Sequence, residues 1–152
     1  MPRRTKTQTY HLSKIIEAPL PFVYAWCTDF REDDGKLTGS TGKRKILEKT
    51  RSRVISTQSY VQNGKETGDV SVVTLMPPRA WRLDTAGNIR DQETGDYKLT
   101  TLGKNKTRLD MVFQVKYGGG ARVPSRKSWE DDSHWFWDKL IVALMKDYSK
   151  TN

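Results

Sequence analysis

A chain of 152 residues with 27 Lys and Arg, 18 Asp and Glu and one cysteine carries a formal net charge of +9. This length suits one domain, residues 1–152, and a lone cysteine excludes an internal disulfide. No stretch approaches about 18 apolar residues, and the basic N-terminus is not followed by the apolar run of a signal peptide, so we expect a cytoplasmic protein. Residues 1–7 are expected to form a flexible basic arm.

The first expected strand covers residues 10–17, where Leu12 and Ile16 alternate with Lys14. The run Ala18-Pro19-Leu20-Pro21 ends this strand. Proline is accommodated in the first turn of a helix, because its missing N–H would have no partner there. The run therefore predicts a strand that passes directly into a helix.

A short helix is expected over residues 20–28, because apolar residues follow at helical spacing: Phe22, Val23, Trp26 and Phe30. The next segment, 31–42, is polar and rich in Asp, Gly, Ser and Thr. It is expected to be a loop, with a single helical turn as the alternative.

Short β-rich runs then occupy residues 46–47, 54–55, 60–61, 70–76, 81–85, 97–102 and 109–117. Turn signals separate several of these runs: Asn63-Gly64, Pro77-Pro78, Gly87-Asn88 and Gly103-Lys104-Asn105. Asn-Gly between two such runs is a strong hairpin signal. The spacing predicts an antiparallel sheet of about six or seven strands.

The last of these runs shows the clearest alternation. One phase of it is apolar and consists of Leu109, Met111, Phe113, Val115 and Tyr117, whereas the other contains Asp110, Gln114 and Lys116. Alternation of this kind predicts a strand with one buried face and one solvated face.

A long amphipathic helix is expected over residues 125–149. Ser125 or Ser128 can cap its start, and acidic residues near that end suit the positive end of the helix dipole. About 24 residues at 1.5 Å each give a length of about 36 Å, enough to cross a sheet. Three indoles crowd its first half, at Trp129, Trp135 and Trp137, and they cannot all share one face.

The order strand, short helix, loop, antiparallel strands and long C-terminal helix resembles the START/Bet v 1-like superfamily (SRPBCC), which includes the polyketide cyclase-like proteins. Two stretches carry the likeness. Residues 15–30 are similar to the family opening, in which a strand ends at Ala-Pro and a short helix ends at Asp-Phe or Asp-Tyr; here these are Ala18-Pro19 and Asp29-Phe30. Residues 109–117, followed by the helix 125–149, resemble its final strand and helix.

The resemblance implies an α+β helix-grip fold, in which a curved sheet wraps around the long helix. It also implies a cavity between sheet and helix for a small apolar or amphipathic ligand, such as a lipid-like or polyketide-like molecule. The residues expected to line that cavity are Trp26, Val72, Trp81, Leu83, Leu99, Met111, Phe113, Trp137, Ile141 and Met145. A shift of strand register by one residue would exchange Val72 for Val73.

Few residues have the spacing of a reactive site. His11 and His134 lack Cys, Asp or Glu companions at metal-ligand spacing, and Cys27 is expected to be a small buried hydrophobe. We therefore expect no catalytic residue, no metal site and no cofactor. An enzyme of the cyclase or dehydratase type on the same fold is the first alternative, with a polar group supplied by Tyr97, Tyr117, Glu17 or Asp96.

Two further alternatives remain open: a protein-interaction or chaperone-regulating domain, and a basic nucleic-acid-binding protein. Lys and Arg are frequent in residues 43–53, but no aromatic residue is interleaved with them for base stacking. The charge therefore favours at most weak electrostatic contact with anionic lipid or nucleic acid.

Overall fold

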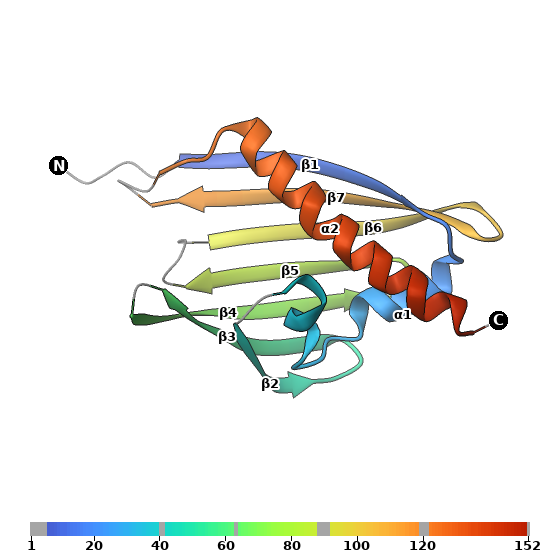
Figure 1. Cartoon of the computed structure of the whole chain (residues 1–152), viewed down its shortest axis with the longest axis horizontal. Helices are drawn as coiled ribbons and strands as arrows, with labels where there is room; N and C mark the ends of the chain where they lie inside the picture. Colours follow the sequence, from blue (N-terminus) through green and yellow to red (C-terminus); the bar gives the residue numbers. More distant parts are fainter. Residues whose placement is uncertain (1–5, 40–41, 63, 88–91, 119–121, 152) are drawn as a thin grey trace.

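The fold is one antiparallel sheet, one long helix and two short helical segments (Figure 1). The computed structural model describes residues 6–39, 42–62, 64–87, 92–118 and 122–151. The elements are β1 (Lys6–Ile16), α1 (Leu20–Thr28), the 3-10 helix η1 (Asp34–Thr38), β2 (Lys43–Lys49), β3 (Arg53–Gln62), β4 (Lys65–Met76), β5 (Ala80–Gly87), β6 (Gln92–Gly103), β7 (Lys106–Tyr117) and α2 (Arg126–Ser149). The predicted α+β helix-grip architecture is confirmed.

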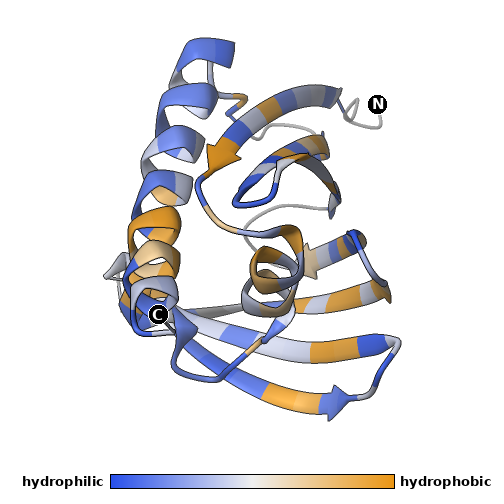
Figure 2. Ribbon diagram, turned by 90° about the vertical axis from the view of Figure 1, so that its right-hand side faces the viewer, coloured by the Kyte–Doolittle hydropathy of each residue, from blue (hydrophilic) through white to orange (hydrophobic). Residues whose placement is uncertain are grey.

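The seven strands lie in the order β1-β7-β6-β5-β4-β3-β2, and every neighbouring pair is antiparallel. Strands β2 to β7 form a meander, and the first strand joins the last one. In the side view of Figure 2 the strands curve around α1, and α2 runs along the open side of the sheet. Within the described part of the chain, no helix is long and apolar enough to cross a membrane.

Strand β1 begins earlier than expected. Lys6 pairs with Tyr117 and Thr7 pairs with Lys116, so residues 6 and 7 belong to the sheet and not to a basic arm. The pairing of these residues with β7 extends the ladder to positions before residue 10, where the predicted strand begins. The remainder of the expected arm, residues 1–5, lies outside the described residues, as does Asn63 of the predicted hairpin turn.

Strand β7 carries the predicted alternation. Leu109, Met111 and Val115 are at most 1% exposed, whereas Gln114 and Lys116 are exposed on the other face. The buried face packs with Tyr10 and Leu12 of β1. This half of the sheet therefore forms the dense core of the domain.

The two main helices begin and end as their sequences predict. Pro19 caps α1 without a side-chain hydrogen bond, and the Ser125 hydroxyl accepts a hydrogen bond of 3.1 Å from the Ser128 amide at the start of α2. Trp129 stacks on Tyr10 with ring centroids 4.1 Å apart, which anchors the first turns of α2 on β1. Trp135 is the indole that faces solvent, with 55% of its surface exposed.

Candidate functional site

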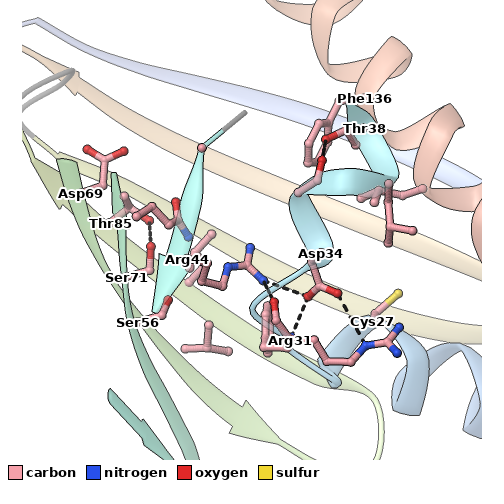
Figure 3. Close-up of a pocket in the computed structure, with 18 of the residues that line it drawn as sticks. Cys27, Arg31, Asp34, Thr38, Arg44, Ser56, Asp69, Ser71, Thr85 and Phe136 are labelled. Carbon is pink, nitrogen blue, oxygen red and sulfur yellow. Dashed lines mark hydrogen bonds and ion pairs between the residues drawn. The ribbon is translucent and has the colours of Figure 1, made fainter. Parts of the chain in front are cut away.

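A cavity of about 330 Å³ lies between the β3–β6 part of the sheet, the middle of α2 and the segment that contains η1 (Figure 3). It forms because α2 crosses the sheet obliquely (Figure 1). The helix packs over β1 and, through Trp129 and Phe113, over β7. Residues of α1 and η1 complete the lining. The sheet residues away from the dense core therefore face an open space.

One wall of the cavity is aromatic. Trp81 of β5 stacks on Tyr97 of β6 with ring centroids 4.9 Å apart and an interplanar angle of 7°. Trp137 of α2 approaches Tyr97 with its ring centroid 6.0 Å away. Since Trp81 and Tyr97 are 3% and 8% exposed, this wall is rigid and suited to the apolar body of a ligand.

The sheet floor of the cavity is polar at its other end. Paired positions on β3, β4 and β5 are occupied by Ser56, Ser71 and Thr85. Asp69 lies two residues before Ser71 on β4 and on the same face of the sheet. The hydroxyls of Ser71 and Thr85 share a hydrogen bond of 3.2 Å. All four residues are less than 9% exposed, so this polar end is part of the interior and not of the surface.

An ion-pair cluster closes the cavity on the η1 side (Figure 3). Arg44 Nη1 of β2 lies 2.8 Å from Asp34 Oδ2 and also donates a hydrogen bond of 3.1 Å to the carbonyl of Arg31. The Arg31 guanidinium lies 3.7 Å from the other oxygen of Asp34. These contacts attach the segment before β2 to the edge of the sheet.

Two titratable groups in the lining have pKa values displaced by their surroundings. Burial raises the pKa of the Cys27 thiol to about 12, which favours the protonated thiol at neutral pH. Burial, with the nearby negative charges of Glu93 and Asp96, also raises the pKa of Tyr97. Its phenol is therefore a hydrogen-bond donor in the cavity and not a base.

Four of the ten residues predicted to line the cavity do so: Trp26, Trp81, Leu83 and Trp137. Leu99, Met111 and Phe113 lie on the inner face of the sheet but are buried in the dense core. Ile141 and Met145 pack against that core from α2. Val72 lies on the opposite face of β4, and Val73 takes its place in the lining.

The polar groups proposed for an enzyme are separated by the fold. Tyr97 lines the cavity, whereas Tyr117 shares a hydrogen bond of 3.3 Å with Tyr10 on β1. The carboxylates of Glu17 and Asp96 are 66% and 53% exposed and face Lys106 and Arg82 respectively. These four residues therefore form no common site.

Sequence reasoning missed the polar floor of the cavity. The signal for it was present, because Asp69 and Ser71 occupy the same phase of β4 as Val73. The set of residues expected to line the cavity contains apolar and aromatic residues only. Arg44 belongs to the basic run of residues 43–53, but its inward direction depends on the β2–β3 register.

No protein-family model and no curated protein matches the chain in sequence. Solved structures match it over most of its length. Ara h 8.0201 superposes with a TM-score of 0.73 at 12% identity, covering 93% of this chain and 99% of that one. A START superfamily protein from Mycobacterium smegmatis gives a TM-score of 0.70 at 14% identity, covering 91% of this chain and 97% of that one.

The Zhui aromatase/cyclase from Streptomyces sp. R1128 is also similar, with a TM-score of 0.66 at 16% identity and 95% of each chain covered. Identities this low show a shared fold alone. The chain therefore has the START/Bet v 1-like fold, as the resemblance in residues 15–30 and in the last strand and helix predicted.

Proposed function

We propose that this protein binds a small amphipathic molecule in the cavity between the sheet, η1 and α2. The observation that carries the proposal is the division of the cavity into an aromatic wall, built by Trp81, Tyr97 and Trp137, and a polar floor, built around Ser71 and Thr85. If this space were only a close-packed hydrophobic core, the sheet would not need buried polar residues where it faces the helix. The resemblance of the sequence to the START/Bet v 1-like superfamily implies a cavity for an apolar or amphipathic ligand, which supports the same function.

The size of the cavity limits the ligand. Ligand sites in proteins commonly measure about 300–1,000 Å³, and a cavity of about 330 Å³ lies at the lower end of that range. A molecule with one or two rings, or a short chain with a polar end, fits such a space better than a sterol or a full lipid. The lone cysteine is compatible with a reducing compartment, and we propose a cytoplasmic location.

Native mass spectrometry of the purified protein tests the proposal, since a retained ligand adds a defined mass that denaturation removes. A pair of variants then places the ligand. Leu140→Trp enlarges a side chain in the cavity lining, whereas Val142→Trp adds the same ring on the exposed side of α2, where Val142 is 70% exposed. We expect the first variant to lose the bound mass and the second to keep it. Retention of the ligand by Leu140→Trp would contradict binding in this cavity.

A further inference from the structure

Asp69 is a buried carboxylate that is not fully paired. Its residue is 7% exposed, and its Oδ1 atom is buried and accepts no hydrogen bond among the described residues. Burying a polar atom without a partner is costly, and the cost is larger for a charged group. Asp69 also lines the cavity, so a bound molecule can supply the missing donor.

The fold fixes the position of this carboxylate. Asp69 pairs with Gln58 on β3 and with Gly87 on β5, so it lies within the sheet and not at its edge. A Cβ atom on Gly87 would collide with Asp69 Oδ1 and with the Gly68 carbonyl oxygen. The absence of a side chain at position 87 therefore gives the Asp69 carboxylate its place beside β5.

The charges around the cavity favour a cation. Among the described residues, five acidic side chains line it, namely Asp29, Glu32, Asp34, Asp69 and Glu93. The lining arginines are Arg31 and Arg44, and both lie within 4 Å of Asp34. Asp29 is paired with Lys49 at 3.2 Å, whereas Asp69 has no ion pair among the described residues. An anionic ligand would meet repulsion at Asp69, whereas a cation would meet its counter-charge.

We propose that the cavity binds an organic cation: a small aromatic or apolar molecule whose protonated amine donates a hydrogen bond to Asp69. The hydroxyls of Ser71 and Thr85 flank the charged end, and the apolar body would extend over Val73 and Leu83 toward the aromatic wall of Trp81, Tyr97 and Trp137. A charge-assisted hydrogen bond in a water-poor site is stronger than a neutral one, which makes Asp69 the source of specificity. This inference rests on the proposed function, since it assigns the chemistry of the ligand in the same cavity.

Three probes of equal length test the charge preference: 4-phenylbutylamine, 4-phenylbutanol and 4-phenylbutyrate. Their affinities are measured by isothermal titration calorimetry at neutral pH and constant ionic strength. We expect the amine to bind at least about tenfold more tightly than the alcohol, because a charged hydrogen bond replaces a neutral one, and the carboxylate to bind most weakly.

Asp69→Asn is the decisive variant. Its control is Asp96→Asn, which makes the same change in net charge at a β6 side chain that is 53% exposed. Asp69→Asn should lower the affinity for the amine by about tenfold and leave that for the alcohol within about twofold. Asp96→Asn should change neither. Equal binding of the three probes to the wild type, or tightest binding of the carboxylate, would overturn the cation proposal and leave the binding function standing. Failure of all three probes to bind, together with no ligand retained in native mass spectrometry, would overturn both the cation proposal and the binding function. The comparison of the three probes on the wild-type protein tests the proposal even if Asp69→Asn does not fold.

Discussion

The indole Nε1 of Trp26 donates a hydrogen bond of 2.9 Å to the Oδ2 atom of Asp147. This bond joins the cavity-lining side of α1 to the last turns of α2. An acidic residue near the C-terminus of a helix faces the negative end of the dipole, which disfavours its charge. The Trp26 donor compensates for this and is the main reason that the pKa of Asp147 is lowered, with smaller contributions from Lys150 and Arg31.

Trp26→Phe keeps an aromatic ring in α1 but removes the donor. We expect a loss of about 0.5–1 kcal/mol of stability at pH 7, in the lower part of the hydrogen-bond range because Asp147 is partly exposed. A carboxyl group whose pKa is lowered by folding stabilises the protein when it is ionised. This stabilisation is complete above the pKa of the group in the unfolded chain, near 4, and is lost as the pH falls through its pKa in the folded protein. Urea denaturation should therefore separate variant and wild type most at pH 7, and the difference should shrink as the pH falls below about 4. Trp135→Phe, at an exposed indole, is the control, and an equal loss at both pH values would contradict the role of Asp147.

Asp69→Asn should not destabilise the free protein. The amide replaces a carboxylate that has one unpaired buried oxygen, so we expect an unchanged or higher stability, by up to about 1 kcal/mol. Urea unfolding without ligand measures the change. A loss greater than about 1 kcal/mol would show that the carboxylate is needed by the fold itself and not by a ligand.

Gly87→Ala should be destabilising by about 1–3 kcal/mol, because the added methyl group collides with Asp69 Oδ1 and with the Gly68 carbonyl oxygen. Combining it with Asp69→Ala should recover only part of the loss, since the Gly68 backbone remains in the way. Gly103→Ala is the matched control: its nearest neighbour is Lys106 Cβ at 3.9 Å, an ordinary contact. Thermal melting of these three variants and the wild type measures the changes.

Trp137→Ala enlarges the cavity and removes one part of its aromatic wall. Full truncation of a buried tryptophan costs about 3–5 kcal/mol, and we expect about 2–3 kcal/mol here because Trp137 is only partly buried. Trp135→Ala, two residues earlier, should cost less than about 0.5 kcal/mol, since that indole is 55% exposed. Similar losses in the two variants would contradict the orientation of α2.

The net charge of +9 should produce only long-range attraction to polyanions. We expect binding to nucleic acid or to vesicles of anionic lipid to be weak, independent of base sequence, and abolished by added salt. Fluorescence anisotropy over a salt series measures this. Tight binding of one nucleotide sequence at physiological salt would instead support the nucleic-acid alternative.

Local sequence signals predicted the helices and strands well where a residue or pattern is compatible with only one backbone conformation. The prolines at 19 and 21 mark the passage from β1 into α1. The alternation of residues 109–117, with Val112 as its exception, indicates which face of β7 is buried. The phase of β4 was harder, because Val72 and Val73 are adjacent β-branched residues that suit either face equally. Only pairing with β3 and β5 decides that Val73 points inward.

The cavity could not be located from the sequence, because the inner face of the sheet is continuous and its residues share one pattern. Met111 and Leu83 both lie on that face, yet the first is 1% exposed within the core and the second lines the cavity. The difference depends on the line along which α2 crosses the strands and on how far η1 extends over β2. Both are tertiary relationships that no single stretch of sequence encodes.

The pairing of β1 with β7 has a consequence for the order of folding. Residues Ser13 and Asp110, joined by a hydrogen bond of 2.7 Å between the two strands, are 97 positions apart in the chain. On the ribosome, β1 emerges first and has no native partner until β7 has been made, whereas the hairpins from β2 to β7 can form as each successive strand appears. Contacts between such distant residues carry a large loop-closure entropy and slow folding. We therefore expect the sheet to be completed last at its β1 edge, with an unpaired amphipathic strand exposed to chaperones or to aggregation until then.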